Sequence, residues 1–278
     1  MVSKGDIKIF KDSSRVLLRV NEFICLLPHP ALREYISNYN ITFPTKDLMP
    51  DSFTVMPCGC GTLSIEKDGE NLSADLHGPV TKPYVVGGQA SQVEMMITIE
   101  FKPAGLYAFT GISQRELTDK TFPLEEINPA LSKLVAEAFE KAESICKMVT
   151  AFDILLLANM RNIAYHPGLK RMLWNINDYA GDITVKRLSN DIHYSERQLN
   201  RIFNQHVGPS AKSFTRLIRI NNTFRLLKKP NNSLTFVSDV AGFHDLSHFI
   251  RDFKLVCGVT PQEYRSNMSD FYNNPKKF

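Results

Sequence analysis

The chain has 278 residues, of which 43% are hydrophobic and 22% are charged, and these proportions exclude a mainly disordered protein. Its most apolar window, residues 148–160, contains Asp153 and is shorter than the roughly 20 apolar residues that a membrane span needs. The first residues show no apolar signal segment, so we expect a cytoplasmic protein. Five cysteines are an odd number, which favours free thiols over a disulfide framework.

Charge is distributed unevenly along the chain. Residues 1–167 hold 16 basic and 20 acidic side chains, a net charge of −4, whereas residues 168–278 hold 17 and 9, a net charge of +8. A basic half joined to an acidic half indicates that the basic half binds a polyanion. Charge alone leaves four possibilities open: DNA, RNA, an anionic membrane surface, or a solvated basic face without a partner.

Residues 1–127 have the pattern of a β-rich domain. Phe53–Val55, Thr62–Ile65 and Val93–Phe101 are rich in β-branched or aromatic residues, which predicts strands, and glycine-containing turns separate them. Short helices are expected near Pro30–Asn38 and Ala104–Thr110.

Residues 128–167 have a helical pattern. A first helix is expected from Pro129 and a second from about Val149 to Ile163. We interpret the segment as a helical connector or a dimerisation segment, with packing inside one chain as the alternative. His166-Pro167-Gly168 is the strongest boundary signal in the sequence.

The basic half contains an internal repeat. Leu188–Gly208 and Val237–Gly258 align, with Ser189 matching Ser238 at an offset of 49 residues and Arg201 matching Arg251 at an offset of 50. Each copy has the pattern of a helix, a tight turn, a second helix and a terminal glycine, which predicts two helix-turn-helix motifs.

Turn and capping residues support this prediction. Gly242 supplies a permissive backbone at the turn of the second copy, and His193 occupies that position in the first. Ser195 and Asp245 are suitable N-caps for the second helix of each copy. The connector, Ser210–Leu227, has helical spacing and would be about 27 Å long as a helix. Successive major grooves lie about 34 Å apart on one DNA face. A helix of this length could therefore hold one recognition helix in each of the two grooves.

These residues resemble the C-terminal DNA-binding domain of the AraC/XylS family of bacterial transcription regulators, over residues 168–268. The strongest block lies around the second motif and comprises Gly242, Phe243, Asp245, Ser247, Phe249, Arg251, Phe253, Lys254, Gly258, Thr260, Pro261, Tyr264 and Arg265. Ser189, Ser238 and Thr223 stand where the family usually has alanine. Residues 56–69 and 101–124 are similar to the β-rich sensor domain of some members.

The resemblance implies an α+β protein, with a β-rich N-terminal sensor domain and an all-α C-terminal domain whose two helix-turn-helix motifs are joined by a long helix. We expect a sensor domain at 1–127, a connector at 128–167, the DNA-binding domain at 168–268 and a basic tail at 269–278.

By the same resemblance, the outer face of each second helix meets bases, since arginine can pair with guanine and asparagine with adenine. The expected base contacts are Arg197, Asn200, Arg201, Leu246, Ser247, His248 and Arg251. The expected phosphate contacts are Lys186, Arg187, Lys212, Arg216 and Lys254, with solvated charge as their alternative. For Arg201 and Arg251 the alternative is an ion pair within the domain, for instance with Asp239 or Asp252.

The function expected is sequence-specific regulation of transcription, modulated through the N-terminal domain. Double-stranded DNA is the expected partner, and a small-molecule effector, RNA polymerase and a second copy of the chain are candidates. Two alternatives stay open: a thiol or metal sensor that uses Cys58 and Cys60, and a constitutive DNA-binding protein without an effector. No catalytic triad order, phosphate-binding glycine loop or paired helical histidines occur, so we expect no enzyme activity, cofactor or metal site.

Overall fold

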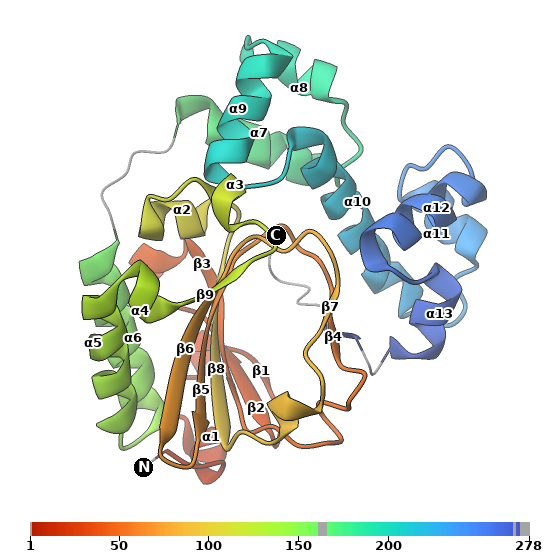
Figure 1. The fold of residues 1–278 in the computed structure, drawn as a ribbon. Helices are drawn as coiled ribbons and strands as arrows, with labels where there is room; N and C mark the ends of the chain where they lie inside the picture. The colour runs from red at the N-terminus through yellow and green to blue at the C-terminus, as the bar shows by residue number, and fades with distance from the viewer. Residues whose placement is uncertain (1, 161–165, 269–270, 273–278) are drawn as a thin grey trace.

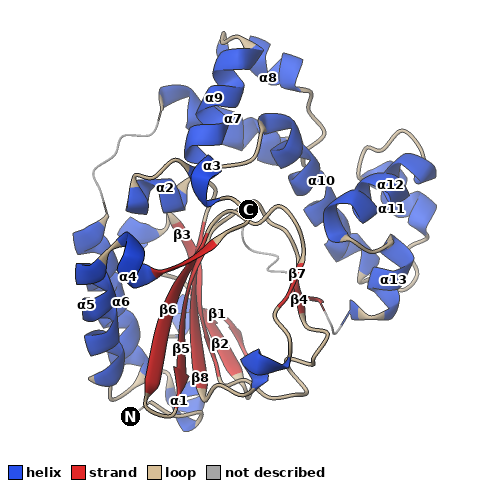
Figure 2. Ribbon diagram, in the orientation of Figure 1, coloured by secondary structure: helices blue, strands red, loops and turns tan. Residues whose placement is uncertain are grey.

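The computed structural model describes residues 2–160, 166–268 and 271–272, and it divides into a sheet-rich N-terminal part and a helical C-terminal part (Figures 1 and 2). This arrangement confirms the predicted α+β class. The N-terminal part is built on a seven-stranded sheet in which every neighbouring pair is antiparallel. In spatial order its strands are β1 (Val16–Arg19), β2 (Phe23–Leu26), β3 (Ile36–Thr42), β8 (Met95–Phe101), β5 (Thr62–Asp68), β6 (Asn71–His77) and β9 (Thr121–Pro123).

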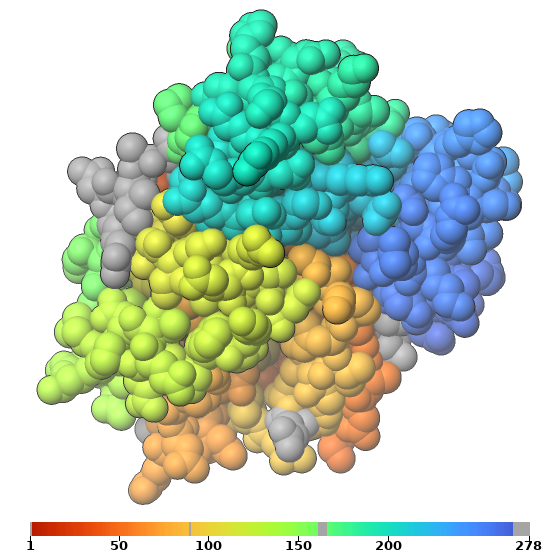
Figure 3. Space-filling view, turned by 45° about the horizontal axis from the view of Figure 1, so that its top comes forward, coloured from red at the N-terminus to blue at the C-terminus, as the bar shows by residue number. Residues whose placement is uncertain are grey.

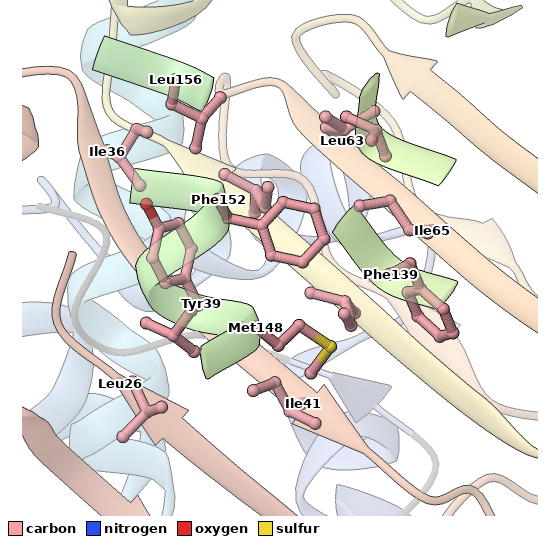
Figure 4. Close-up of a cluster of buried hydrophobic side chains, with 14 of the residues drawn as sticks. Leu26, Ile36, Tyr39, Ile41, Leu63, Ile65, Phe139, Met148, Phe152 and Leu156 are labelled. Atoms are coloured by element: carbon pink, nitrogen blue, oxygen red, sulfur yellow. The ribbon is translucent and has the colours of Figure 1, made fainter. Parts of the chain in front are cut away.

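One face of this sheet is apolar and is covered by helices α5 (Pro129–Glu140) and α6 (Ile145–Asn159). Figure 4 shows Phe139 and Phe152 of these helices among the aliphatic side chains of β3 and β5. The buried carboxylate of Asp153 on α6 pairs with Arg15 at 2.8 Å and accepts a hydrogen bond from the hydroxyl of Tyr39 at 2.9 Å. The segment expected to connect domains or to dimerise therefore packs on the sheet of its own chain.

The opposite face of the sheet is polar, as strand alternation requires. Buried Asn40 of β3 donates hydrogen bonds to Glu100 at 3.0 Å and to Thr98 at 3.2 Å, both on β8. On this side lies a small sheet in the order β10 (Phe271–Tyr272), β4 (Thr54–Val55) and β7 (Tyr84–Val85) (Figure 1). Strand β10 pairs with β4 in parallel, so residues 271–272 lie against the N-terminal part.

The N-terminal part also contains shorter elements. They are α1 (Gly5–Ile9), α2 (Gly105–Thr110), α3 (Gln114–Leu117), α4 (Leu124–Ile127) and three 3-10 helices at Ser13–Arg15, Pro30–Leu32 and Gly88–Ser91.

The C-terminal part is helical from residue 167 to residue 266 and has two hydrophobic cores. Its helices are α7 (Pro167–Asp178), α8 (Val185–Ile192), α9 (Glu196–His206), α10 (Ala211–Leu227), α11 (Leu234–Val240), α12 (Leu246–Cys257) and α13 (Pro261–Ser266). Phe214 and Ile218 of α10 belong to the core of the first motif, and Phe224 and Leu227 belong to that of the second. The long helix is therefore the common support of both motifs.

Two expectations about the N-terminal part need correction. The helix expected near Pro30–Asn38 is a short 3-10 helix followed by strand β3, because Tyr39 and Ile41 alternate with polar residues and pair with β8 across the sheet. The second helix after Pro129 begins at Ile145, because the Ser144 side chain caps it by accepting a hydrogen bond from the amide of Lys147. Its expected end at Ile163 lies outside the described residues. The strands expected at 53–55, 62–65 and 93–101 and the helix at 104–110 are present, with shifted ends.

Candidate nucleic-acid interface

Each motif has one turn between its two helices, and in both turns one residue has a left-handed backbone. His193, after α8, lies in the left-handed region with φ 57° and ψ 39°, and Gly242 lies there with φ 72°. The side chain of Ser195 accepts a hydrogen bond from the Gln198 amide at 3.2 Å. Asp245 does the same for the His248 amide at 2.6 Å, and this bond lowers the pKa of its carboxyl group. Each second helix is thus fixed at its first turn by a side-chain cap.

The second helices bury one face and expose the other. Leu199 and Phe203 of α9 and Phe249 and Phe253 of α12 are fully buried. Helix α10, which joins the motifs, has 17 residues and is therefore about 26 Å long.

The base-contact residues expected on α9 differ in their environments. Arg197 and Arg201 are exposed. Asn200 is half-buried, and both ends of its amide are engaged: Nδ2 donates to the carbonyl of Glu196 at 3.0 Å, and Oδ1 accepts from the amide of Ala211 at 3.2 Å. Asn200 therefore fastens α9 to the start of α10 in this conformation.

The residues expected on α12 also fall into two groups. Ser247 and Arg251 are exposed. Leu246 packs partly against the second core, and His248 lies between the ring of Phe243, 5.3 Å away, and the carboxylate of Asp252, 3.4 Å from its Nε2.

Among the phosphate-contact residues, Lys186, Lys212 and Lys254 are exposed. Arg187 donates to the Tyr179 hydroxyl at 2.7 Å and lies over that ring, and Arg216 forms an ion pair with Asp252 at 3.2 Å.

Asp252 therefore pairs with Arg216 and His248. Within residues 2–160, 166–268 and 271–272, neither Arg201 nor Arg251 forms an ion pair.

The hydroxyls that replace the usual alanines have different partners. Ser189 donates to the carbonyl of Tyr194, and Thr223 donates to the carbonyl of Ile220 at 2.7 Å, so both are satisfied inside the fold. The hydroxyl of Ser238 is fully buried and has no hydrogen-bond partner among the described residues. An unsatisfied buried hydroxyl costs about 1–3 kcal/mol.

Cys58 and Cys60 lie on either side of Gly59, where the two halves of the chain meet. Both are buried, and each thiol donates to the carbonyl of the other. Next to them, the carbonyl of Pro57 accepts a hydrogen bond from Asn221 of α10 at 3.0 Å. Among the described residues, no three side chains of metal-binding type lie together.

A second contact joins the halves beside α9, and no local pattern in the sequence predicts it. Helix α3 packs against α9, and Gln205 donates to the hydroxyl of Tyr107 on α2 at 3.1 Å. The yellow surface around α2 and α3 adjoins the teal surface of α9 in Figure 3. A hollow beside this contact is lined by residues of both halves: Ser113, Arg115, Arg197, Asn200, Arg201, Asn204 and Gln205.

The C-terminal part therefore has paired helix-turn-helix motifs. Each motif has its own hydrophobic core and an exposed arginine on its second helix, and one long helix supports both. A family profile described as "Helix-turn-helix domain" matches residues 188–267, and one described as "Domain of unknown function (DUF6597)" matches residues 25–123. Residues 188–267 therefore form a helix-turn-helix domain, and the expected resemblance to AraC-type regulators is confirmed over this part of the chain.

Three curated relatives carry the same kind of domain. The uncharacterized HTH-type transcriptional regulator YisR of Bacillus subtilis is 26% identical over 143 residues, which is 49% of this chain and 50% of YisR. YobQ of the same organism, also an uncharacterized HTH-type transcriptional regulator, is 31% identical over 31% of this chain and 36% of its own length. The HTH-type transcriptional activator RhaS of Pectobacterium atrosepticum is 21% identical over 51% of this chain and 54% of RhaS. The chain thus spans about half the length, or less, of these relatives.

Among the described residues, no helix is both long and apolar enough to span a membrane.

Proposed function

We propose that the chain is a cytoplasmic regulator of transcription that binds a specific DNA sequence through α9 and α12, placed in successive major grooves. The observation that carries the proposal is the matched position of Arg201 and Arg251. Both are exposed on the second helix of a motif, and α10 holds both motifs. Arginine pairs with the guanine edge through two hydrogen bonds, and each such pair discriminates by about 1–3 kcal/mol.

The surrounding charges suit the same partner. Lys186, Lys212 and Lys254 are exposed near helix ends and can meet phosphates on either side of the bases. If about six phosphates are neutralised in total, the logarithm of the binding constant should fall with the logarithm of salt concentration with a slope of about −5.

The N-terminal part supports a regulatory role because it contacts the DNA-binding part directly. The contacts at Pro57–Asn221 and Tyr107–Gln205 join the two halves, so a change in one can alter the presentation of the other. The buried polar face of the sheet suits a polar effector, and a coupling of about 1–3 kcal/mol between the sites would be sufficient for regulation.

Two further partners belong to the proposal. On α6 the side chains of Ile154 and Leu157 are 62% and 38% exposed, and these neighbouring apolar groups favour a second copy of the chain as a partner. RNA polymerase is the partner that activation of transcription would require.

The proposal is tested by selecting binding sites from a random-sequence duplex pool with the full chain and footprinting the selected duplex. We expect two protected patches about one helical turn apart and an affinity at least about 10³ times that for unrelated DNA. The variant Arg201→Ala/Arg251→Ala should lose both patches. Lys133→Ala/Lys147→Ala, which removes two exposed charges from α5 and α6, should keep them.

Similar affinity for selected and unrelated duplexes would instead support a constitutive binder without sequence preference. A salt slope near zero would contradict DNA binding altogether. Transcription from the selected site, with RNA polymerase and purified protein, then decides between activation and repression.

A further inference from the structure

Helix α3 of the N-terminal part packs against α9. Gly208, just after α9, lies so close to α3 that a β-carbon there would be 2.5 Å from the Thr118 hydroxyl and 3.1 Å from the Gln114 carbonyl. His206 at the end of α9 meets the ring of Tyr107 with 4.2 Å between ring centroids. These contacts involve only the C-terminal end of α9, and the exposed Arg197 and Arg201 lie one to three turns earlier.

The hollow between α3 and α9 is rich in hydrogen-bond donors. It is lined by three arginines, of which Arg197 and Arg201 come from α9 and Arg115 comes from α3. Its other lining residues, Ser113, Asn200, Asn204 and Gln205, are uncharged. The carboxylates nearest in the sequence, Glu116 and Glu196, are exposed but do not line it. Within the described residues, Arg115 has no ion-pair partner.

This hollow lies where a DNA strand would pass. A helix in the major groove, which is about 12 Å wide, is bordered on both sides by sugar-phosphate backbones. Arg197 and Arg201 line the hollow and are also the proposed base contacts of α9, so one backbone of a duplex bound as proposed would run beside α3. We propose that Arg115, with the hydroxyl of Ser113 beside it, binds a phosphate of that backbone, so that the N-terminal part forms a portion of the DNA interface.

This inference rests on the proposed function. It deepens that function because the N-terminal part would then contact DNA itself. A shift of α3 would change the affinity for DNA through a phosphate contact without moving α9. The alternative is that α3, because it lies so close to α9, obstructs the duplex and weakens binding.

The test uses the full chain and the selected duplex, titrated over a series of salt concentrations. Arg115→Gln removes the proposed contact, Arg115→Lys keeps its charge, and Lys133→Gln removes one exposed charge from α5, on the far side of the sheet from the C-terminal half (Figure 1). We expect Arg115→Gln to reduce the magnitude of the salt slope by about 1 and to weaken binding similarly for selected and unrelated duplexes. Arg115→Lys should retain most of the slope, and Lys133→Gln should match the wild type.

Ethylation interference gives an independent reading. With the wild type, ethylation of one phosphate beside the α9 half-site should weaken binding, and with Arg115→Gln the same ethylation should have no effect. An unchanged slope and an unchanged interference pattern in Arg115→Gln would overturn the inference, and tighter binding would replace it with obstruction by α3. If the wild type itself prefers no sequence, the proposed function fails first, so the two failures are distinguishable.

Discussion

His206, at the end of α9, is buried where the two halves of the chain meet. Its side chain is buried, its ring meets Tyr107 edge to face, and its Nδ1 has no hydrogen-bond partner among the described residues. Burial, with a smaller contribution from the nearby His166, lowers the pKa of His206 to about 4. The imidazole is therefore neutral at neutral pH, and protonating it would place a charge inside the contact.

The pKa of His206 predicts a loss of stability in acid. The unfolded chain takes up a proton near pH 6.5 and the folded chain only near pH 4, so the contribution is complete above about pH 6.5 and is lost as pH falls toward 4. The loss should be on the order of 2 kcal/mol in the free energy of unfolding. Urea denaturation of the wild type and of His206→Gln across this range checks it. If both show the same pH dependence, the pKa of His206 is not lowered.

At the scale of elements, the two motifs differ at the turn residue. His193 has the left-handed backbone that costs an L-residue about 1–2 kcal/mol, whereas the second motif uses Gly242. The amides of both donate to the carbonyl three residues earlier, at 3.2 Å and 3.1 Å. The motifs are thus built alike, with strain in the first only.

Exchanging these residues should therefore have opposite effects. His193→Gly should raise the free energy of unfolding by about 0.5–1 kcal/mol, since relief of strain exceeds the added entropy of the unfolded chain. Gly242→Ala should lower it by more than about 1 kcal/mol, because its β-carbon would also lie 2.5 Å from the Asp182 carboxylate. Chemical denaturation measures both, with His193→Ala as control. If His193→Gly and His193→Ala had the same free energy of unfolding, the left-handed backbone at residue 193 would not be a source of strain.

At the scale of the whole molecule, the helical half is docked on the sheet-rich half by close contacts that are mostly uncharged. Gly59 has φ 66°, and a β-carbon there would lie 3.0 Å from the ring of Phe214 on α10. Met56 belongs to the core of the second motif. The exposed ion pair between Lys170 and Glu34 adds little, as is usual for solvent-exposed pairs.

A matched pair of glycines tests this docking. Gly59 and Gly69 have nearly the same φ, 66° and 60°, but Gly69 has open space around it. Gly59→Ala and Gly69→Ala therefore share the backbone strain, and only the first presses on Phe214. We expect Gly59→Ala to speed hydrogen exchange of residues 56–60 and of α10 more than Gly69→Ala does. Equal hydrogen exchange in the two variants would mean that the close contact between Gly59 and Phe214 does not hold the two halves together.

The two motifs, their caps and turn residues, and the long helix between them could all be predicted from the amino-acid sequence. These features depend on residues a few positions apart, so Ser195, Asp245 and Gly242 were sufficient to predict them. The repeat also placed Arg201 and Arg251 on equivalent exposed faces.

The sequence does not reveal which polar groups already have partners in the fold or which distant segments are in contact. Asn200 and Arg216 have the same appearance in the sequence as exposed DNA-contact residues, yet each has a partner in the fold. The segment expected to be a helix near Pro30 became strand β3, and Arg115 was brought beside Arg197 from a distant part of the chain. The physical reason is common to these cases: the energies of strand pairing, ion pairing and domain contact depend on residues far apart in the sequence, and local patterns do not record them.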